Sequence, residues 1–132
     1  MTDLRITLWH TDPYPTAPGV YLGCFPALGH DVTCVFDDRP SPHEHTLEQV
    51  TRAGLRLVRL PMDKRAHSPA LRALIATGGY DVIHTHRASY KVLLRSCGGQ
   101  PLPPVVVNRG QSRPLRAAER RRMLHPAVRA HV

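Results

Sequence analysis

The feature that most constrains the fold is a regular alternation of short apolar runs with segments of helical periodicity. The apolar runs cover residues 4–9, 32–36, 55–60, 81–86 and 104–108, and a sixth begins at 130. Continuous runs such as 105–107 (VVV) are typical of strands that are buried on both sides. Because strands that alternate with helices pair in parallel, the pattern predicts one α/β domain over residues 1–132, with helices on both faces of its sheet.

Start and stop signals give the bounds of the predicted helices. These helices run over 41–54, 68–78 and 89–97, and from Ser112 to just before Pro126. The helix at 68–78 starts with a Ser-Pro pair and stops at two glycines, and the last helix contains Leu115, Ala118 and Leu124. Within the third apolar run, Arg56 and Arg59 indicate a strand at the edge of the sheet.

The chain is basic, with 18 Lys and Arg against 10 Asp and Glu, and a formal net charge of +8. Such a balance indicates a phosphate-rich partner or follows from codon usage alone. Arg120, Arg121 and Arg122 on the last helix are candidates for contact with anionic lipid headgroups or a charged acceptor, or they form a solvated face. Aromatic residues make up only 5% of the chain, which argues against a nucleic-acid partner.

The cysteines and the first residues of the chain indicate the cellular compartment of the protein. Cys24, Cys34 and Cys97 form no CxxC pair, and the charged start of the chain lacks the apolar stretch of a signal peptide. No apolar run approaches the roughly 18 residues that span a bilayer. We therefore expect reduced thiols in a cytoplasmic protein whose membrane contact is peripheral, at the inner face of the membrane.

Candidate binding residues follow the first, fourth and fifth apolar runs. In a doubly wound sheet, ligands bind at the carboxyl ends of the strands. Gly19 is placed where a helix would begin, so an anion could approach its backbone N–H groups, although a simple turn glycine explains it too. Arg109 and Gly110 follow the most apolar run, and a guanidinium there can clamp a phosphate or carboxylate.

His84 and His86 are two residues apart on a predicted strand, so they point to the same side. They could hold a sugar hydroxyl or a phosphate, serve as structural histidines, or form a metal pair. A metal site needs at least a third ligand, and no carboxylate or Cys with partner spacing accompanies them. No metal is therefore expected, and no catalytic residue is assigned.

Three segments together resemble the N-terminal domain of family 4 glycosyltransferases. Residues 27–33 (ALGHDVT) are similar to the family's Gly-His turn into its second strand. Residues 81–86 (DVIHTH) resemble its Asp-Val-Ile-His-x-His strand, and 104–110 (PVVVNRG) its Pro-Val-Val strand and glycine turn. Where the family often has His before that glycine, this chain has Arg109, so a catalytic His is not carried over.

The resemblance implies the N-terminal half of a GT-B fold, in which two Rossmann-like domains face a cleft. The N-terminal domain mainly binds the acceptor, and the C-terminal domain holds a nucleotide-sugar. Gly19, His84, His86, Arg109 and Gly110 would then face the cleft. The expected partners are a glycan or lipid-linked acceptor, with cell-envelope polysaccharide as product class, and a C-terminal domain or partner chain. No cofactor is expected to bind this half, which is expected to be truncated before the donor domain and inactive alone.

Two other classes of function remain open from the sequence. The Arg-rich last helix also fits a non-catalytic Rossmann-like module that binds an anionic glycan, a lipid or a partner protein. The histidine pair also fits a metal-dependent hydrolase.

Overall fold

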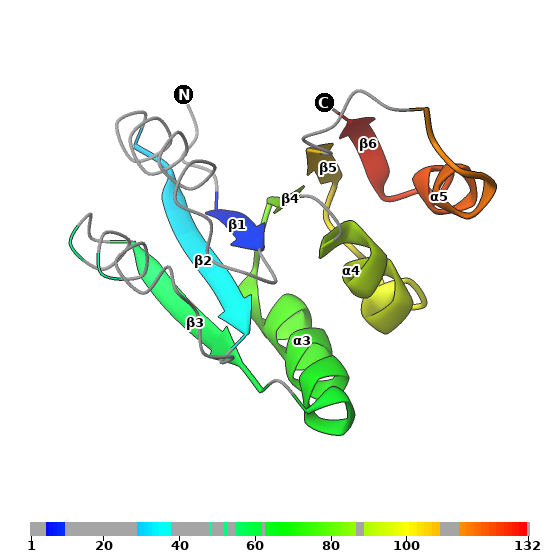
Figure 1. The fold of residues 1–132 in the computed structure, drawn as a ribbon. Coiled ribbons are helices and arrows are strands. Elements are labelled where there is room, and N and C mark those ends of the chain that lie inside the picture. Colours follow the sequence, from blue (N-terminus) through cyan, green and yellow to red (C-terminus); the bar gives the residue numbers. More distant parts are fainter. Residues whose placement is uncertain are drawn as a thin grey trace.

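A six-stranded parallel sheet forms the centre of the molecule (Figure 1). The computed structural model describes residues 5–9, 29–37, 48, 52, 55–61, 63–86, 89–108 and 114–131. The strands are β1 (Arg5–Trp9), β2 (Asp31–Asp37), β3 (Arg56–Leu60), β4 (Val82–His86), β5 (Val105–Asn108) and β6 (Val128–His131). Five of them match the predicted runs closely, and β6 begins two residues earlier than expected.

The strand order is β3-β2-β1-β4-β5-β6, and every neighbouring pair is parallel. This is the Rossmann-like arrangement, in which the order reverses between β1 and β4. The predicted α/β fold class is therefore confirmed. The predicted edge position of the third strand is also confirmed, because β3 is the last strand on its side. Its Arg56 pairs with Asp31 of β2, with Nη2 3.3 Å from Oδ2.

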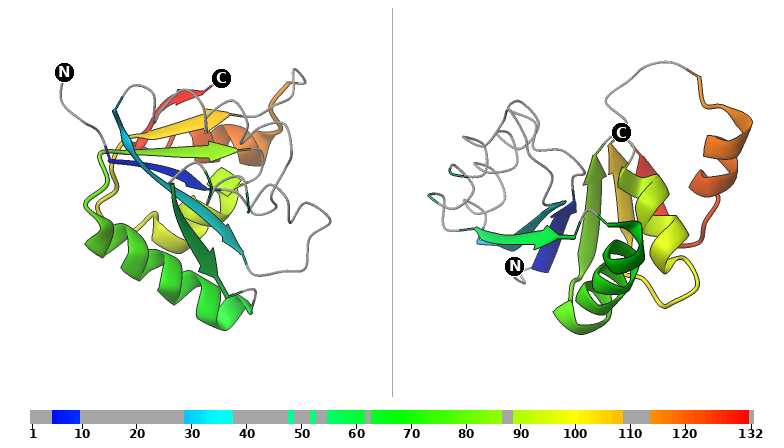
Figure 2. Two further views of the ribbon diagram at one scale, coloured as in Figure 1. Left: turned by 90° about the vertical axis from the view of Figure 1, so that its left-hand side faces the viewer. Right: turned by 60° about the horizontal axis from the view of Figure 1, so that its bottom comes forward.

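The described helices cover one face of this sheet. They are α3 (Lys64–Gly78), α4 (Ser89–Cys97) and α5 (Ala117–Met123). Figure 2 shows α3 and α4 side by side on that face, with α5 beyond α4 toward β6. Glu48 and Arg52, in the β2–β3 connection, are helical.

A hydrophobic core fills the space between the sheet and these helices. Its sheet side comes from β2 to β5, and its helix side comes from α3 and α4. Its fully buried members include Leu71 of α3, Leu93 of α4, Ile83 of β4 and Val105 and Val107 of β5. Met123 of α5 and Ala127 pack against the same cluster, so α5 belongs to this layer.

Helix α3 starts earlier than the sequence indicated. The Ser68-Pro69 pair was expected to begin it, but Asp63 caps it, and the Asp63 carboxylate accepts a hydrogen bond from the Arg65 N–H at 3.0 Å. Pro69 lies inside the helix, where it removes one backbone hydrogen bond. The Ser68 hydroxyl bonds to the hydroxyl of Ser96 on α4 at 2.9 Å instead of capping. The predicted stop is confirmed, because Gly79 adopts the left-handed conformation with φ 63°.

Helix α4 has the predicted bounds, whereas α5 differs from its prediction. Helix α5 begins at Ala117, and its cap residue Arg116 makes no side-chain cap bond. Of the three apolar residues expected in this helix, Leu115 precedes it, Ala118 is exposed, and Leu124 ends it with 82% of its surface exposed. The helix turns Glu119 inward instead, at 4% exposure.

Among the described residues, no helix combines the length and the hydropathy of a membrane span. The predicted helix over 41–54 is described only at Glu48 and Arg52.

Candidate functional site

The carboxyl ends of β1, β4 and β5 lie side by side, as the predicted site requires. The register aligns Leu8 of β1 with His84 of β4, and His84 with Val106 of β5. At the end of β4, His86 aligns with Asn108. These strands flank the point where the strand order reverses, which is where doubly wound sheets bind ligands.

His84 occupies the middle of the sheet, on the face turned away from α3 and α4. Its neighbours Ile83 and Thr85 are fully buried on the helix-covered face, and strand alternation turns His84 to the other side. Its side chain is half-buried and its Nε2 atom is buried. The sheet register aligns His84 with Cys34 of β2 and with Val106 of β5. Neither of these two side chains is charged. The His84 imidazole is therefore the most polar side chain among these residues aligned across the sheet.

Burial lowers the pKa of the His84 imidazole below its ordinary value. The charged form is penalised because fewer water molecules surround it than in solution. Near neutral pH the ring is therefore uncharged, with one nitrogen that donates and one that accepts a hydrogen bond. A neutral imidazole suits a hydroxyl group better than a phosphate, which gains most from a cation.

The other predicted acceptor-site residues are described less fully. His86 is the last residue of β4, and its side chain lies outside the described part, so its predicted contact stays a prediction. Gly19, Arg109 and Gly110 lie outside the described residues, so their predicted contacts stay predictions. Within the described part, no three His, Cys, Asp or Glu side chains are grouped closely enough to hold a metal ion.

The two described cysteines are free thiols buried in the fold. Burial raises the pKa of Cys34 to about 12. Burial also raises the pKa of Cys97 to about 11, against a smaller opposing effect of the Arg72 charge. Such thiols are poor nucleophiles at neutral pH, so neither is a candidate catalytic group.

Two of the three arginines of α5 line a separate groove. Arg120 and Arg121 are exposed and Arg122 is half-buried. Arg121 and Arg122 border a hollow of about 440 Å³ between α4 and α5, and Arg95 of α4 lies on its other side. Arg120 is absent from this lining, and sequence reasoning missed Arg95. Nothing in the sequence signals that pairing, because it depends on how α4 and α5 pack.

Comparisons with known proteins show the fold. The chain is similar to the glycotransferase of kitacinnamycin, with 22% sequence identity and a TM-score of 0.57, over 93% of this chain and 34% of that chain. It is also similar to glycinamide ribonucleotide transformylase 1 from Symbiobacterium toebii, with 17% identity and a TM-score of 0.48, over 63% of this chain and 41% of that chain. Comparison with protein-family models gives no match, and comparison with curated proteins gives none.

The chain spans about a third of the length of that glycotransferase structure. Along nearly its whole length it therefore has the fold of one part of a glycosyltransferase. At this level of identity the similarity extends to the fold and not to the substrates.

Proposed function

We propose that this chain is the acceptor-side domain of a GT-B sugar transferase. The complete enzyme would move a sugar from a nucleotide-sugar to a glycan or to a lipid-linked acceptor, at the cytoplasmic face of the membrane. The observation that carries the proposal is the fold similarity to part of a glycotransferase over 93% of the chain. The resemblance of residues 81–86 and 104–110 to the strands of family 4 enzymes supports the same assignment.

The chemistry of His84 fits an acceptor site. A half-buried neutral imidazole beside the reversal of strand order can hydrogen-bond a sugar hydroxyl in either direction. Carbohydrate recognition needs such neutral donors and acceptors more than it needs charge. In this proposal His84 and His86 orient acceptor hydroxyls, and Gly19, Arg109 and Gly110 contact a phosphate or a sugar near the same edge of the sheet.

The proposal assigns the donor to a different domain. The matched glycotransferase is about three times as long as the matching part, which leaves room there for a second domain. We therefore expect this chain alone to bind acceptors but not nucleotide-sugars with micromolar affinity, and to need that domain or a partner chain for transfer.

Amide chemical-shift mapping on the full chain tests the proposal. A soluble disaccharide and a short isoprenyl phosphate serve as acceptor probes, and a uridine diphosphate sugar serves as the donor probe. We expect at least one acceptor probe to shift the amides at the ends of β4 and β5, around His86 and Asn108. The donor probe is expected to shift no amide at micromolar concentration.

Two variants on the same face of β4 sharpen the test. His84→Gln keeps a polar group but changes its reach, and it should weaken acceptor binding about tenfold, the scale of one lost hydrogen bond. Val82→Ala, at the other end of the strand, should leave binding unchanged. Micromolar binding of the donor probe, or equal loss in both variants, would contradict the proposal.

A further inference from the structure

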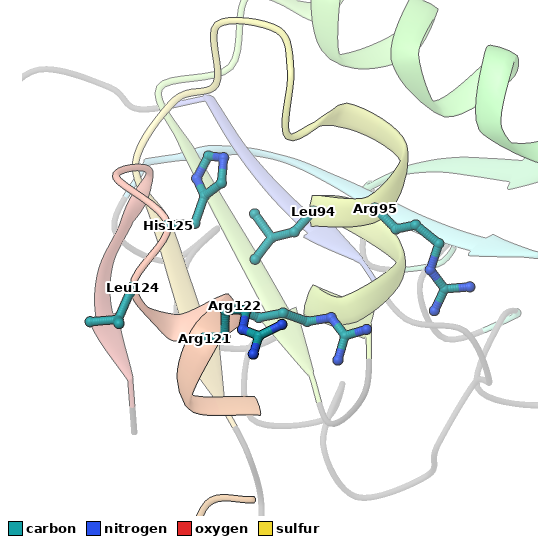
Figure 3. Close-up of a pocket in the computed structure, with 6 residues that line it drawn as sticks. All are labelled: Leu94, Arg95, Arg121, Arg122, Leu124 and His125. Atoms are coloured by element: carbon teal, nitrogen blue, oxygen red, sulfur yellow. The ribbon is translucent and has the colours of Figure 1, made fainter. Parts of the chain in front are cut away.

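A groove between α4 and α5 lies on the helix-covered side of the molecule, apart from the proposed acceptor site (Figure 3). Its walls are Leu94 and Arg95 of α4 and Arg121, Arg122, Leu124 and His125 from the end of α5 and the turn after it. Helix α4 starts after the carboxyl end of β4, so its second half lies near the amino ends of the strands. The groove is therefore near the sheet edge opposite the proposed acceptor site.

Positive charge exceeds negative charge in the two chain segments that supply the walls of this groove. The described residues of 89–108 and 114–131 include the basic side chains Lys91, Arg95, Arg116, Arg120, Arg121, Arg122 and Arg129. The single acid in these two ranges is Glu119, which is buried at 4% exposure. Figure 3 shows Arg121 and Arg122 reaching under Leu94 toward α4, with Arg95 on the far side. A ligand in the groove would thus meet three guanidinium groups, which favours phosphate.

The groove also contains an exposed apolar group. Leu124, the residue that ends α5, is 82% exposed and is the large hydrophobic side chain most open to solvent among the described residues. It lies at the end of the groove opposite Arg95 (Figure 3). A leucine among arginines is the combination by which surface segments bind membranes: the cations meet lipid phosphates, and the apolar side chain enters the acyl boundary.

Hydrogen bonds between the His125 ring and backbone groups hold the groove in shape. His125 Nε2 donates to the carbonyl oxygen of Gly98 at 3.0 Å, and the Ala127 N–H donates to His125 Nδ1 at 3.1 Å. Because a carbonyl only accepts and an N–H only donates, these partners place the ring proton on Nε2. The imidazole thereby ties the turn after α5 to the end of α4, and the groove is formed before a ligand binds.

We infer that the α4–α5 groove docks the chain on an anionic lipid surface. Arg95, Arg121 and Arg122 bind lipid phosphates, and Leu124 inserts beside them. A nucleic-acid surface fits less well, because no Phe, Tyr or Trp is among the described residues that line the groove and an exposed leucine adds nothing to phosphate binding. The inference names a surface that the acceptor proposal does not need, and the carboxyl edge of the sheet stays open when the groove is occupied.

Vesicle co-sedimentation of the full chain tests the inference. Vesicles that mix phosphatidylglycerol with phosphatidylcholine should pellet the protein, and vesicles of phosphatidylcholine alone should not. Each surface arginine contributes about fivefold to such binding, so Arg121→Gln combined with Arg122→Gln should weaken it about 25-fold. Leu124→Gln should weaken it about fivefold without any change in net charge.

A matched control separates the groove from the net charge of the chain. Arg52 and Arg65 are exposed and lie outside the groove lining, so Arg52→Gln combined with Arg65→Gln removes the same charge elsewhere. This control should change vesicle binding less than about twofold, because distant surface charges are screened. Equal loss in the control, full binding by the Leu124→Gln variant, or tighter binding to a single-stranded oligonucleotide than to the vesicles would overturn the inference. Circular dichroism confirms that each variant is folded.

Discussion

The two faces of strand β4 differ in what they bury. Ile83 and Thr85 turn toward α3 and α4, and both are 0% exposed. His84, between them, turns to the opposite face and is half-buried. On the helix-covered face, the hydroxyl of Thr85 donates to the Val106 carbonyl oxygen at 3.3 Å, so its polar group is satisfied within the sheet.

This difference separates the part of the sheet that specifies the fold from the part that can bind a ligand. The helix-covered face is packed with Leu, Ile, Val and Tyr side chains and has little room for change. The opposite face carries a titratable ring at the position where the strand order reverses. A binding role is one reason for a polar side chain to occupy this position.

The largest expected effect compares two adjacent valines of β5. Val107 is 0% exposed on the helix-covered face, and Val106 is half-buried on the other. Val107→Ala should lower the free energy of unfolding by about 2 kcal/mol, because it removes buried carbon and leaves a cavity. Val106→Ala should cost less than about 1 kcal/mol. Urea unfolding of both variants measures the difference. Equal losses would mean that the two faces are packed alike.

A smaller loss of stability is expected when a helix on the helix-covered face loses its cap. Asp63→Ala removes the carboxylate that accepts from the Arg65 N–H at the start of α3, and it should cost about 1 kcal/mol. Arg116→Ala at the start of α5 is the control, because the Arg116 side chain makes no cap bond. It should change the midpoint of thermal unfolding little. A loss as large as that of Asp63→Ala would show that α5 is stabilised through Arg116 in some other way.

The strands could be predicted from the sequence because each depends on a local property. Residues 105–107 are apolar without interruption, which is typical of a strand covered on both sides. The start of α3 could not be predicted in the same way, because Asp63 and Ser68 both suit a helix start, and in the structure Asp63 is the cap while Ser68 bonds to Ser96. The edge position of β3 was readable from Arg56 and Arg59, since charged residues protect an exposed strand edge.

Helix α5 and the groove show where local reasoning fails. The sequence places Leu115, Ala118 and Leu124 in the last helix, yet the helix begins after Leu115, is capped by Leu124 and buries Glu119. Its orientation is set by the contact of Met123 with the core and by the bonds of His125. The candidate acceptor site could be predicted in part. The sequence identified His84 and the three strand ends, but their adjacency depends on a strand order that only the structure gives.

The smallest expected effect is the pH dependence that His84 adds to stability. Burial lowers the pKa of its imidazole in the folded chain below the ordinary value of 6.5. As the pH falls through that value, the unfolded chain takes up a proton that the folded chain does not, so the stability present above pH 6.5 is progressively lost. Urea midpoints at about pH 7.5 and about pH 5.5 should differ less in His84→Leu than in the wild-type chain, because the two chains differ only at this residue. An unchanged difference would mean that the ring is as well solvated when folded as when unfolded.

Acceptor binding offers an independent readout over the same pH range. If the neutral His84 ring holds a hydroxyl, acceptor binding weakens as the ring gains its proton. A phosphate held by a charged ring would instead bind more tightly as the ring gains its proton.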